Sequence, residues 1–198
     1  MCLFIIDSDE SHPSNTTTII GVTYDDGVIL GSTNTITQLT ANVVSCHCAL
    51  ETEILLEDAR SFILDQESTM VVAETICTML SAYNYNKKNM LQTALIIGGG
   101  SKLYEICCGG MVMEKSNLAV GGYGVTYLRD FLEKEWKNGM NEVQAEELVL
   151  KALSLSGGSI CGVQTTSVNS KGITRAFHPY DTLLPIRQDE LELKHVNE

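Results

Sequence analysis

The fold of this chain is decided by one stretch near its start, Thr17-Thr18-Ile19-Ile20-Gly21-Val22-Thr23-Tyr24-Asp25-Asp26-Gly27-Val28-Ile29-Leu30-Gly31. Residues 17–22 and 28–32 are rich in β-branched and aliphatic side chains, which favour extended strands. Asp25-Asp26-Gly27 lies between them, and its glycine tolerates the positive φ that a tight turn requires. The stretch therefore predicts a β-hairpin.

Beyond this hairpin the spacing of apolar residues changes along the chain. Residues 36–56 look strand-like, whereas from about Asp58 the apolar residues recur at helical spacing. Residues 93–97 and 103–107 predict two strands joined by a turn at 98–101. The apolar positions of the helical region are Phe62, Ile63, Val72, Ile76, Met79, Leu80 and Tyr83.

Two more helices and two more strands complete the pattern. The second of these helices opens with Asn141 and Gln144, spaced as in a capping box. The last strands, 159–168 and 172–177, flank a turn. This order predicts an α+β fold, a four-layer αββα sandwich in which helices cover two stacked antiparallel sheets. The apolar helix faces consist of Tyr127, Leu128, Phe131 and Leu132, and of Ala145, Leu148, Val149, Ala152 and Leu153.

Composition limits the classes of function. The chain has 198 residues, 25 acidic against 13 basic, and a net charge of −12, which disfavours nucleic acid and anionic membrane surfaces as partners. Seven cysteines without a secretory signal indicate a reducing, intracellular compartment. No apolar run approaches the roughly 18 residues of a membrane span. These features predict a single globular domain.

Three motifs follow one another along the chain. The hairpin of residues 17–31 comes first, then Gly109-Gly110-Met111-Val112-Met113 with residues 118–124, then Asn138-Gly139-Met140 before a helix that ends near Ser156. In this order they resemble β-type subunits of the 20S proteasome, and the second motif is similar to the caspase-like class. The resemblance covers about residues 17–180. It implies the N-terminal-nucleophile hydrolase fold.

The resemblance also implies partners and a location. A β-type subunit occupies an inner seven-membered ring, beside other β subunits, next to an alpha ring and opposite a second β ring. The implied location is the cytoplasm and the nucleus. We further expect residues 1–16 to be a retained leader, residues 17–185 to form the domain, and residues 186–198 to be an acidic tail.

In this family a threonine exposed by removal of the leader is the nucleophile, and its own α-amine is the base. A lysine, two aspartates and a serine support it. Thr17 falls at the nucleophile position, but Thr16 precedes it where the family has glycine. Thr33 stands where the first aspartate is expected, and our placement puts His47 at the lysine position. No lysine occurs between Met1 and Asn86.

The remaining supporting groups are also replaced. Val125 stands at the position of the serine, and the aspartate that should precede Ser156 is missing, since there is no aspartate between Asp130 and Asp181. Losing members of such a catalytic unit typically costs about 10³-fold or more in rate. The sequence therefore predicts a structural subunit whose Thr17 is a vestige.

Two other functions remain open at this stage. In the first, Thr17 is exposed and cleaves after acidic residues, with His47 replacing the lysine. In the second, the chain is a self-assembling peptidase or amidase outside a eukaryotic core particle. We expect neither metal nor cofactor, because Cys46-His47-Cys48 lies among strand residues and lacks the usual zinc spacing. Likewise Gly98-Gly99-Gly100-Ser101 lacks the phosphate-loop spacing.

Overall fold

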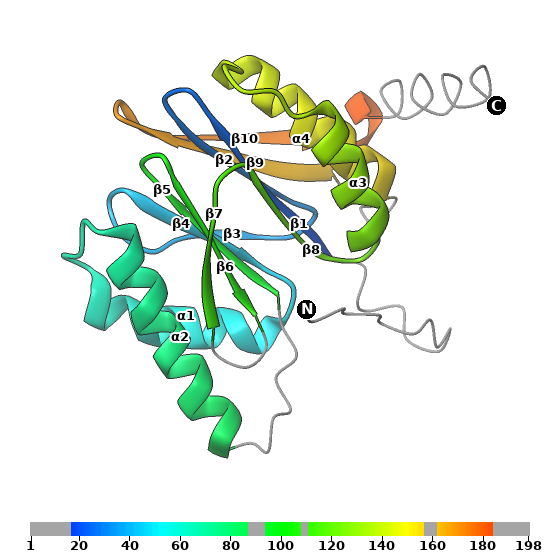
Figure 1. The fold of residues 1–198 in the computed structure, drawn as a ribbon. Coiled ribbons are helices and arrows are strands. Elements are labelled where there is room, and N and C mark those ends of the chain that lie inside the picture. The colour runs from blue at the N-terminus through cyan, green and yellow to red at the C-terminus, as the bar shows by residue number, and fades with distance from the viewer. Residues whose placement is uncertain (1–16, 87–93, 108–110, 157–161, 184–198) are drawn as a thin grey trace, which may run out of the picture.

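The structure is a computed structural model, and it describes residues 17–86, 94–107, 111–156 and 162–183. These residues form two antiparallel sheets of five strands, stacked between two pairs of helices (Figure 1). The predicted four-layer αββα sandwich is therefore confirmed. The expected leader 1–16 and tail 186–198 lie outside the described residues.

The first sheet, sheet A, contains the predicted hairpin. β1 (Thr18–Tyr24) pairs with β2 (Gly27–Ser32), and Tyr24 faces Gly27 across the turn. β8 (Leu118–Gly122) pairs with the other edge of β1. β9 (Gly162–Asn169) pairs with β2, and β10 (Gly172–Pro179) forms the outer edge. Sheet A thus has the order β10-β9-β2-β1-β8.

Sheet B has the order β3-β4-β5-β6-β7, so its strands are neighbours in sequence as well as in space. Its members are β3 (Ile36–Gln38), β4 (Val43–His47), β5 (Leu95–Gly99), β6 (Lys102–Cys107) and β7 (Met111–Lys115). β5 extends through Gly98 and Gly99, two residues that we had assigned to the turn. Only Gly100 and Ser101 separate β5 from β6.

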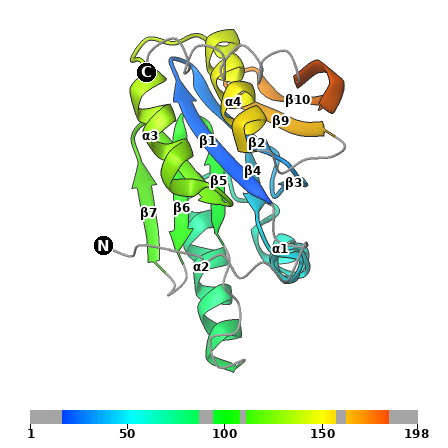
Figure 2. The same ribbon diagram turned by 90° about the vertical axis from the view of Figure 1, so that its right-hand side faces the viewer.

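Each sheet carries helices on its outer face (Figures 1 and 2). α1 (Leu50–Ile63) and α2 (Thr69–Asn86) cover sheet B, whereas α3 (Val125–Glu135) and α4 (Glu142–Ser156) cover sheet A. Three apolar cores result: one under α1 and α2, one under α3 and α4, and one between the sheets. No helix in the described ranges is long and apolar enough to cross a membrane.

The structure corrects the predicted start of the helical region and parts of two predicted helix faces. The helical segment begins at Leu50 rather than near Asp58, and it consists of two helices separated at residues 64–68. Phe62 is 72% exposed, although Ile63 beside it is buried. In α3 the buried residues are Leu128 and Leu132, because they lie one turn apart on the side facing sheet A, while Tyr127 is 43% exposed.

The predicted capping box at the start of α4 is confirmed. The backbone N–H of Gln144 donates to Asn141 Oδ1 at 3.0 Å, and the backbone N–H of Asn141 donates to Gln144 Oε1 at 3.0 Å. Two backbone donors at the helix N-terminus, which have no partner inside the helix, are satisfied in this way.

Candidate functional site

Thr17 immediately precedes β1 and is half-buried. Ile19, two residues further on, belongs to the core between the sheets, whereas Ile20 packs under α3 and α4. Because side chains alternate across a strand, Thr17 lies on the face of β1 that points toward sheet B. The candidate site is therefore at the end of the space between the two sheets.

The backbone of Thr17 is held by residues from three other parts of the chain. Its carbonyl oxygen accepts a hydrogen bond from the backbone N–H of Tyr123 at 3.1 Å. The thiol of Cys48, just after β4, donates to the same oxygen at 3.7 Å. A Cβ on Gly122 would lie 2.0 Å from this oxygen and 2.9 Å from Cys48 Sγ, and Gly122 has φ +90°. Only glycine can occupy position 122 without displacing Thr17.

Thr33 lies beside the site, bonded to the neighbour of Thr17. Its hydroxyl accepts a hydrogen bond from the backbone N–H of Thr18 at 2.9 Å, and its own N–H donates to the Thr18 carbonyl at 3.1 Å. The Thr18 hydroxyl in turn donates to the carbonyl of Tyr123 at 3.2 Å. Thr33 thus extends the pairing of β1 with β2. Where the family resemblance calls for a carboxylate, this chain has a neutral hydroxyl that holds the backbone.

The structure does not bring His47 to Thr17. Val43 of β4 packs under α1 and α2, whereas Val44 and Cys46 belong to the core between the sheets. His47 shares the face of Val43, so its ring points away from sheet A. Its Nδ1 lies 2.9 Å from the carbonyl oxygen of Ala49, and the side chain is almost fully buried.

Burial also lowers the pKa of His47 below its usual value, and the Ala49 carbonyl and the nearby Glu53 offset this effect only in part. The imidazole is therefore neutral near pH 7. A neutral ring on the far face of sheet B cannot supply the positive charge that a lysine beside the threonine would supply.

The residue that does reach Thr17 from β4 is Cys48, which sequence reasoning had not singled out for this role. Cys46 and Cys48 both face the space between the sheets, and His47 between them faces the helices. Strict alternation along the predicted strand was the available signal, and it was obscured because residues 36–56 read as one strand-like stretch, although they contain β3, β4 and the start of α1. The same alternation separates the three potential ligands of the Cys-His-Cys run.

Burial raises the pKa of the Cys46 thiol well above its usual value, and the neighbouring Cys48 raises it further. Cys46 is therefore a protonated core residue rather than a nucleophile. Across the described ranges, no group of three His, Cys, Asp or Glu side chains could hold a metal ion. Cys108 and Cys161 lie outside these ranges.

The other two expected positions, Val125 and Ser156, lie in the helices that cover sheet A. Val125 is the first residue of α3, and it packs against the core between sheet A and its helices. Ser156 is the last residue of α4, and its buried hydroxyl donates to the Leu153 carbonyl at 2.8 Å. Among the described residues, no hydrogen bond joins either side chain to Thr17.

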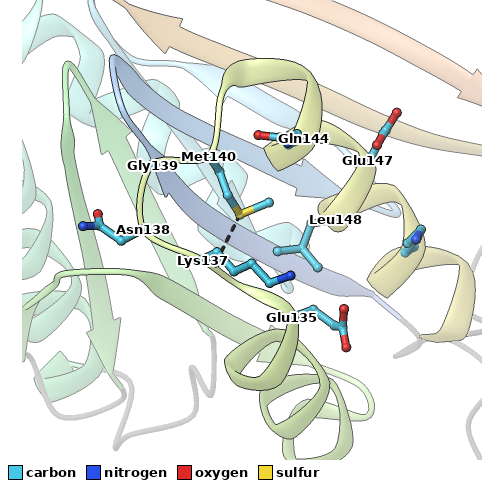
Figure 3. Close-up of a pocket in the computed structure, with 9 residues that line it drawn as sticks. Glu135, Lys137, Asn138, Gly139, Met140, Gln144, Glu147 and Leu148 are labelled. Carbon is cyan, nitrogen blue, oxygen red and sulfur yellow. Dashed lines mark hydrogen bonds between the residues drawn. The ribbon is translucent and has the colours of Figure 1, made fainter.

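A separate surface pocket of about 320 Å³ lies where the chain passes from α3 to α4 (Figure 3). Met140 and Leu148 contribute apolar groups, and the charged side chains at its edge include Glu135, Lys137 and Glu147. The pocket contains none of the residues that contact Thr17.

Taken together, two stacked antiparallel sheets between helix pairs, with a threonine leading into a central strand of one sheet, define the N-terminal-nucleophile hydrolase class of fold. Comparison with known proteins identifies a family within this class. The family model described as "Proteasome subunit" matches residues 51–168.

Among curated relatives, proteasome subunit beta type-6 of Arabidopsis thaliana is 40% identical over 207 residues, covering 89% of this chain and 87% of the relative. The probable proteasome subunit beta type-1 of Schizosaccharomyces pombe is 30% identical, covering 86% and 87%. Proteasome subunit beta type-6 of Dictyostelium discoideum is 27% identical, covering 84% and 91%. This chain belongs to the proteasome subunit family and is a β-type subunit of the 20S core.

Proposed function

We propose that this chain is a non-catalytic, structural β subunit of the 20S proteasome, and that it contributes to protein degradation by building the wall of the core particle. One observation carries the proposal. In the described part of the chain, the residues held against the Thr17 carbonyl are Cys48, Gly122 and Tyr123, and none of these provides an ammonium or a carboxylate group.

A threonine hydroxyl needs help to become a nucleophile. Its proton must be taken by a base, and a nearby cation must keep that base poised near neutral pH. In this chain the position expected for a carboxylate is Thr33, whose hydroxyl is engaged with the Thr18 backbone. His47, the residue expected at the lysine position, has a neutral imidazole. It lies on the face of sheet B that points toward the helices and away from Thr17. Both features favour an inactive Thr17.

The partners and the location follow from the same proposal. The subunit would stand in an inner ring beside other β subunits, between an alpha ring and the opposing β ring, in the cytoplasm and the nucleus. Two of the similar proteins are named beta type-6 and one is named beta type-1, and the Gly-Gly-Met motif at residues 109–111 resembles the caspase-like class. We therefore place the chain at the ring position of that class.

The test is made on assembled particles. Intact mass and N-terminal sequencing of this subunit should give a chain that extends upstream of Thr17. An epoxyketone probe should label other β subunits of the particle, which serve as the internal positive control, and should leave Thr17 unlabelled. The variant Thr17→Ala should assemble normally and leave cleavage after acidic residues unchanged.

Two results would contradict the structural proposal. A subunit trimmed to Thr17 and covalently labelled on that residue is a processed threonine endopeptidase, and the structural proposal is then wrong. Capture of the chain as a homomer without alpha subunits would instead indicate a self-assembling peptidase.

A further inference from the structure

The loop between α3 and α4 has two fixed ends. On one side, the indole N–H of Trp136 donates to the Thr23 carbonyl at 2.9 Å. On the other side, the carbonyl of Met140 accepts the backbone N–H of Asp25 at 3.1 Å. Both bonds attach the loop to the β1–β2 hairpin, so the backbone at Trp136 and at Met140 is held in place.

Between these anchors, Asn138 and Gly139 form the tip of the loop. Both residues are exposed, and Asn138 lies on the outer side of the loop from Met140 (Figure 3). Gly139 has φ +83°, and a Cβ built on it would meet no atom within 4 Å. In the described part of the chain, neither the Asn138 side-chain amide nor the Gly139 N–H has a hydrogen bond. The Asn138 amide and the Gly139 nitrogen are therefore accessible to water, and neither is engaged with another group of the described chain.

We propose that Asn138 is a site of spontaneous deamidation. Solvent takes the proton from the backbone nitrogen of Gly139, which attacks Cγ of Asn138 and closes a five-membered succinimide. The bond between Cγ and the side-chain nitrogen breaks, and that nitrogen takes up a proton from solvent and leaves as ammonia. Water then opens the ring at either carbonyl and yields aspartate or isoaspartate. The only co-reactant is water, and no group is oxidised or reduced.

Other asparagines of the described chain provide a contrast. The side-chain amide of Asn169 donates to the Tyr24 hydroxyl at 2.9 Å, and its Oδ1 accepts the N–H of Lys171 at 2.8 Å. Asn141 is engaged in the capping box. Neither is followed by glycine, so the next backbone nitrogen is shielded by a Cβ as well. At Asn138, in the described chain, the side-chain amide has no hydrogen bond and the following residue has no Cβ.

The products change the surface at a defined place. Either product carries a carboxylate, which makes the chain one unit more negative and adds an acid near Glu135 and Glu147 at the edge of the pocket. Isoaspartate also inserts one methylene into the backbone between the anchors at Trp136 and Met140. The modification would therefore alter both the charge and the course of the loop that joins α3 to α4.

The experiment ages the purified full chain in mildly alkaline buffer at physiological temperature and follows its proteolytic peptides by mass spectrometry. We expect the Asn138 peptide to gain the mass of an amide-to-acid exchange and to split into two chromatographic products. The peptides that contain Asn141 and Asn169 should stay intact over the same period and act as internal controls.

Two variants make the result specific. Asn138→Gln should remove the acidic species from isoelectric focusing, since the longer side chain closes a less favourable ring. Gly139→Ala should slow the reaction by about tenfold, the factor that corresponds to a barrier about 1.4 kcal/mol higher. An Asn138 peptide that stays intact in the folded chain, or acidic species that persist in Asn138→Gln, would overturn the proposal.

Discussion

The Thr52 side chain in the first turn of α1 is fully buried, and its hydroxyl has no hydrogen-bond partner in the described structure. A buried hydroxyl without a partner costs about 1–3 kcal/mol of stability, because it has given up water without compensation. Valine has nearly the same shape and a similar helix propensity. We therefore expect Thr52→Val to stabilise the fold by about 1–3 kcal/mol.

The matched control is the same substitution at a bonded threonine. The buried Thr165 hydroxyl lies 2.7 Å from Glu146 Oε1 and 3.0 Å from His178 Nε2. Thr165→Val should destabilise the fold by about 1–3 kcal/mol, since it removes these bonds and leaves their partners without them. The two substitutions change the same atoms and differ in the sign of their effect.

Urea denaturation followed by the fluorescence of the single Trp136 measures both variants, and thermal melting gives a second reading. For a chain of this size, 1 kcal/mol shifts the melting temperature by roughly 2–4 °C. A loss of stability in Thr52→Val comparable with that in Thr165→Val would refute the reasoning, because it would mean that the Thr52 hydroxyl makes a bond in solution.

Three other substitutions have defined outcomes. Gly122→Ala should cost about 2–5 kcal/mol, since it combines a left-handed backbone with overlap at Thr17, and its melting temperature checks this. Because burial lowers the pKa of His47 in the folded chain, the unfolded chain takes up the imidazole proton first as the pH falls. The free energy of unfolding should therefore decrease as the pH drops below about 6.5. His47→Gln should reduce that slope in urea titrations over the same range, and an unchanged slope would contradict the assignment. Asn141→Ala should cost about 1 kcal/mol of folding stability through loss of the cap. A substitution of the exposed Glu133 should cost less and serves as the reference.

Much of the fold followed from local sequence signals. The turn at Asp25-Asp26 and the capping box at Asn141 depend on residues close together in the chain, and both were confirmed. The start of α1 was missed because the residue before it, Ala49, makes no side-chain cap. Without a capping side chain, the change from strand to helix after His47 leaves little trace in the sequence.

The candidate site was less predictable than the fold. Thr17 and Thr33 could be named because both belong to the recognisable hairpin. The contacts of Cys48 and Tyr123 with Thr17 were missed, since these residues lie 31 and 106 positions further along the chain and reach Thr17 through the pairing and stacking of strands. Val125 and Ser156 were named from the resemblance, and their side chains belong to the helix layer outside sheet A.

The sequence by itself determined which chemical groups are available: it contains no lysine before residue 87, and it has a threonine at the head of a β-hairpin. Only the tertiary structure decided which groups meet. One residue along a strand turns a side chain to the opposite face of the sheet, so the pairing of β4 with β5 sends His47 toward the helices and leaves Cys48 at Thr17.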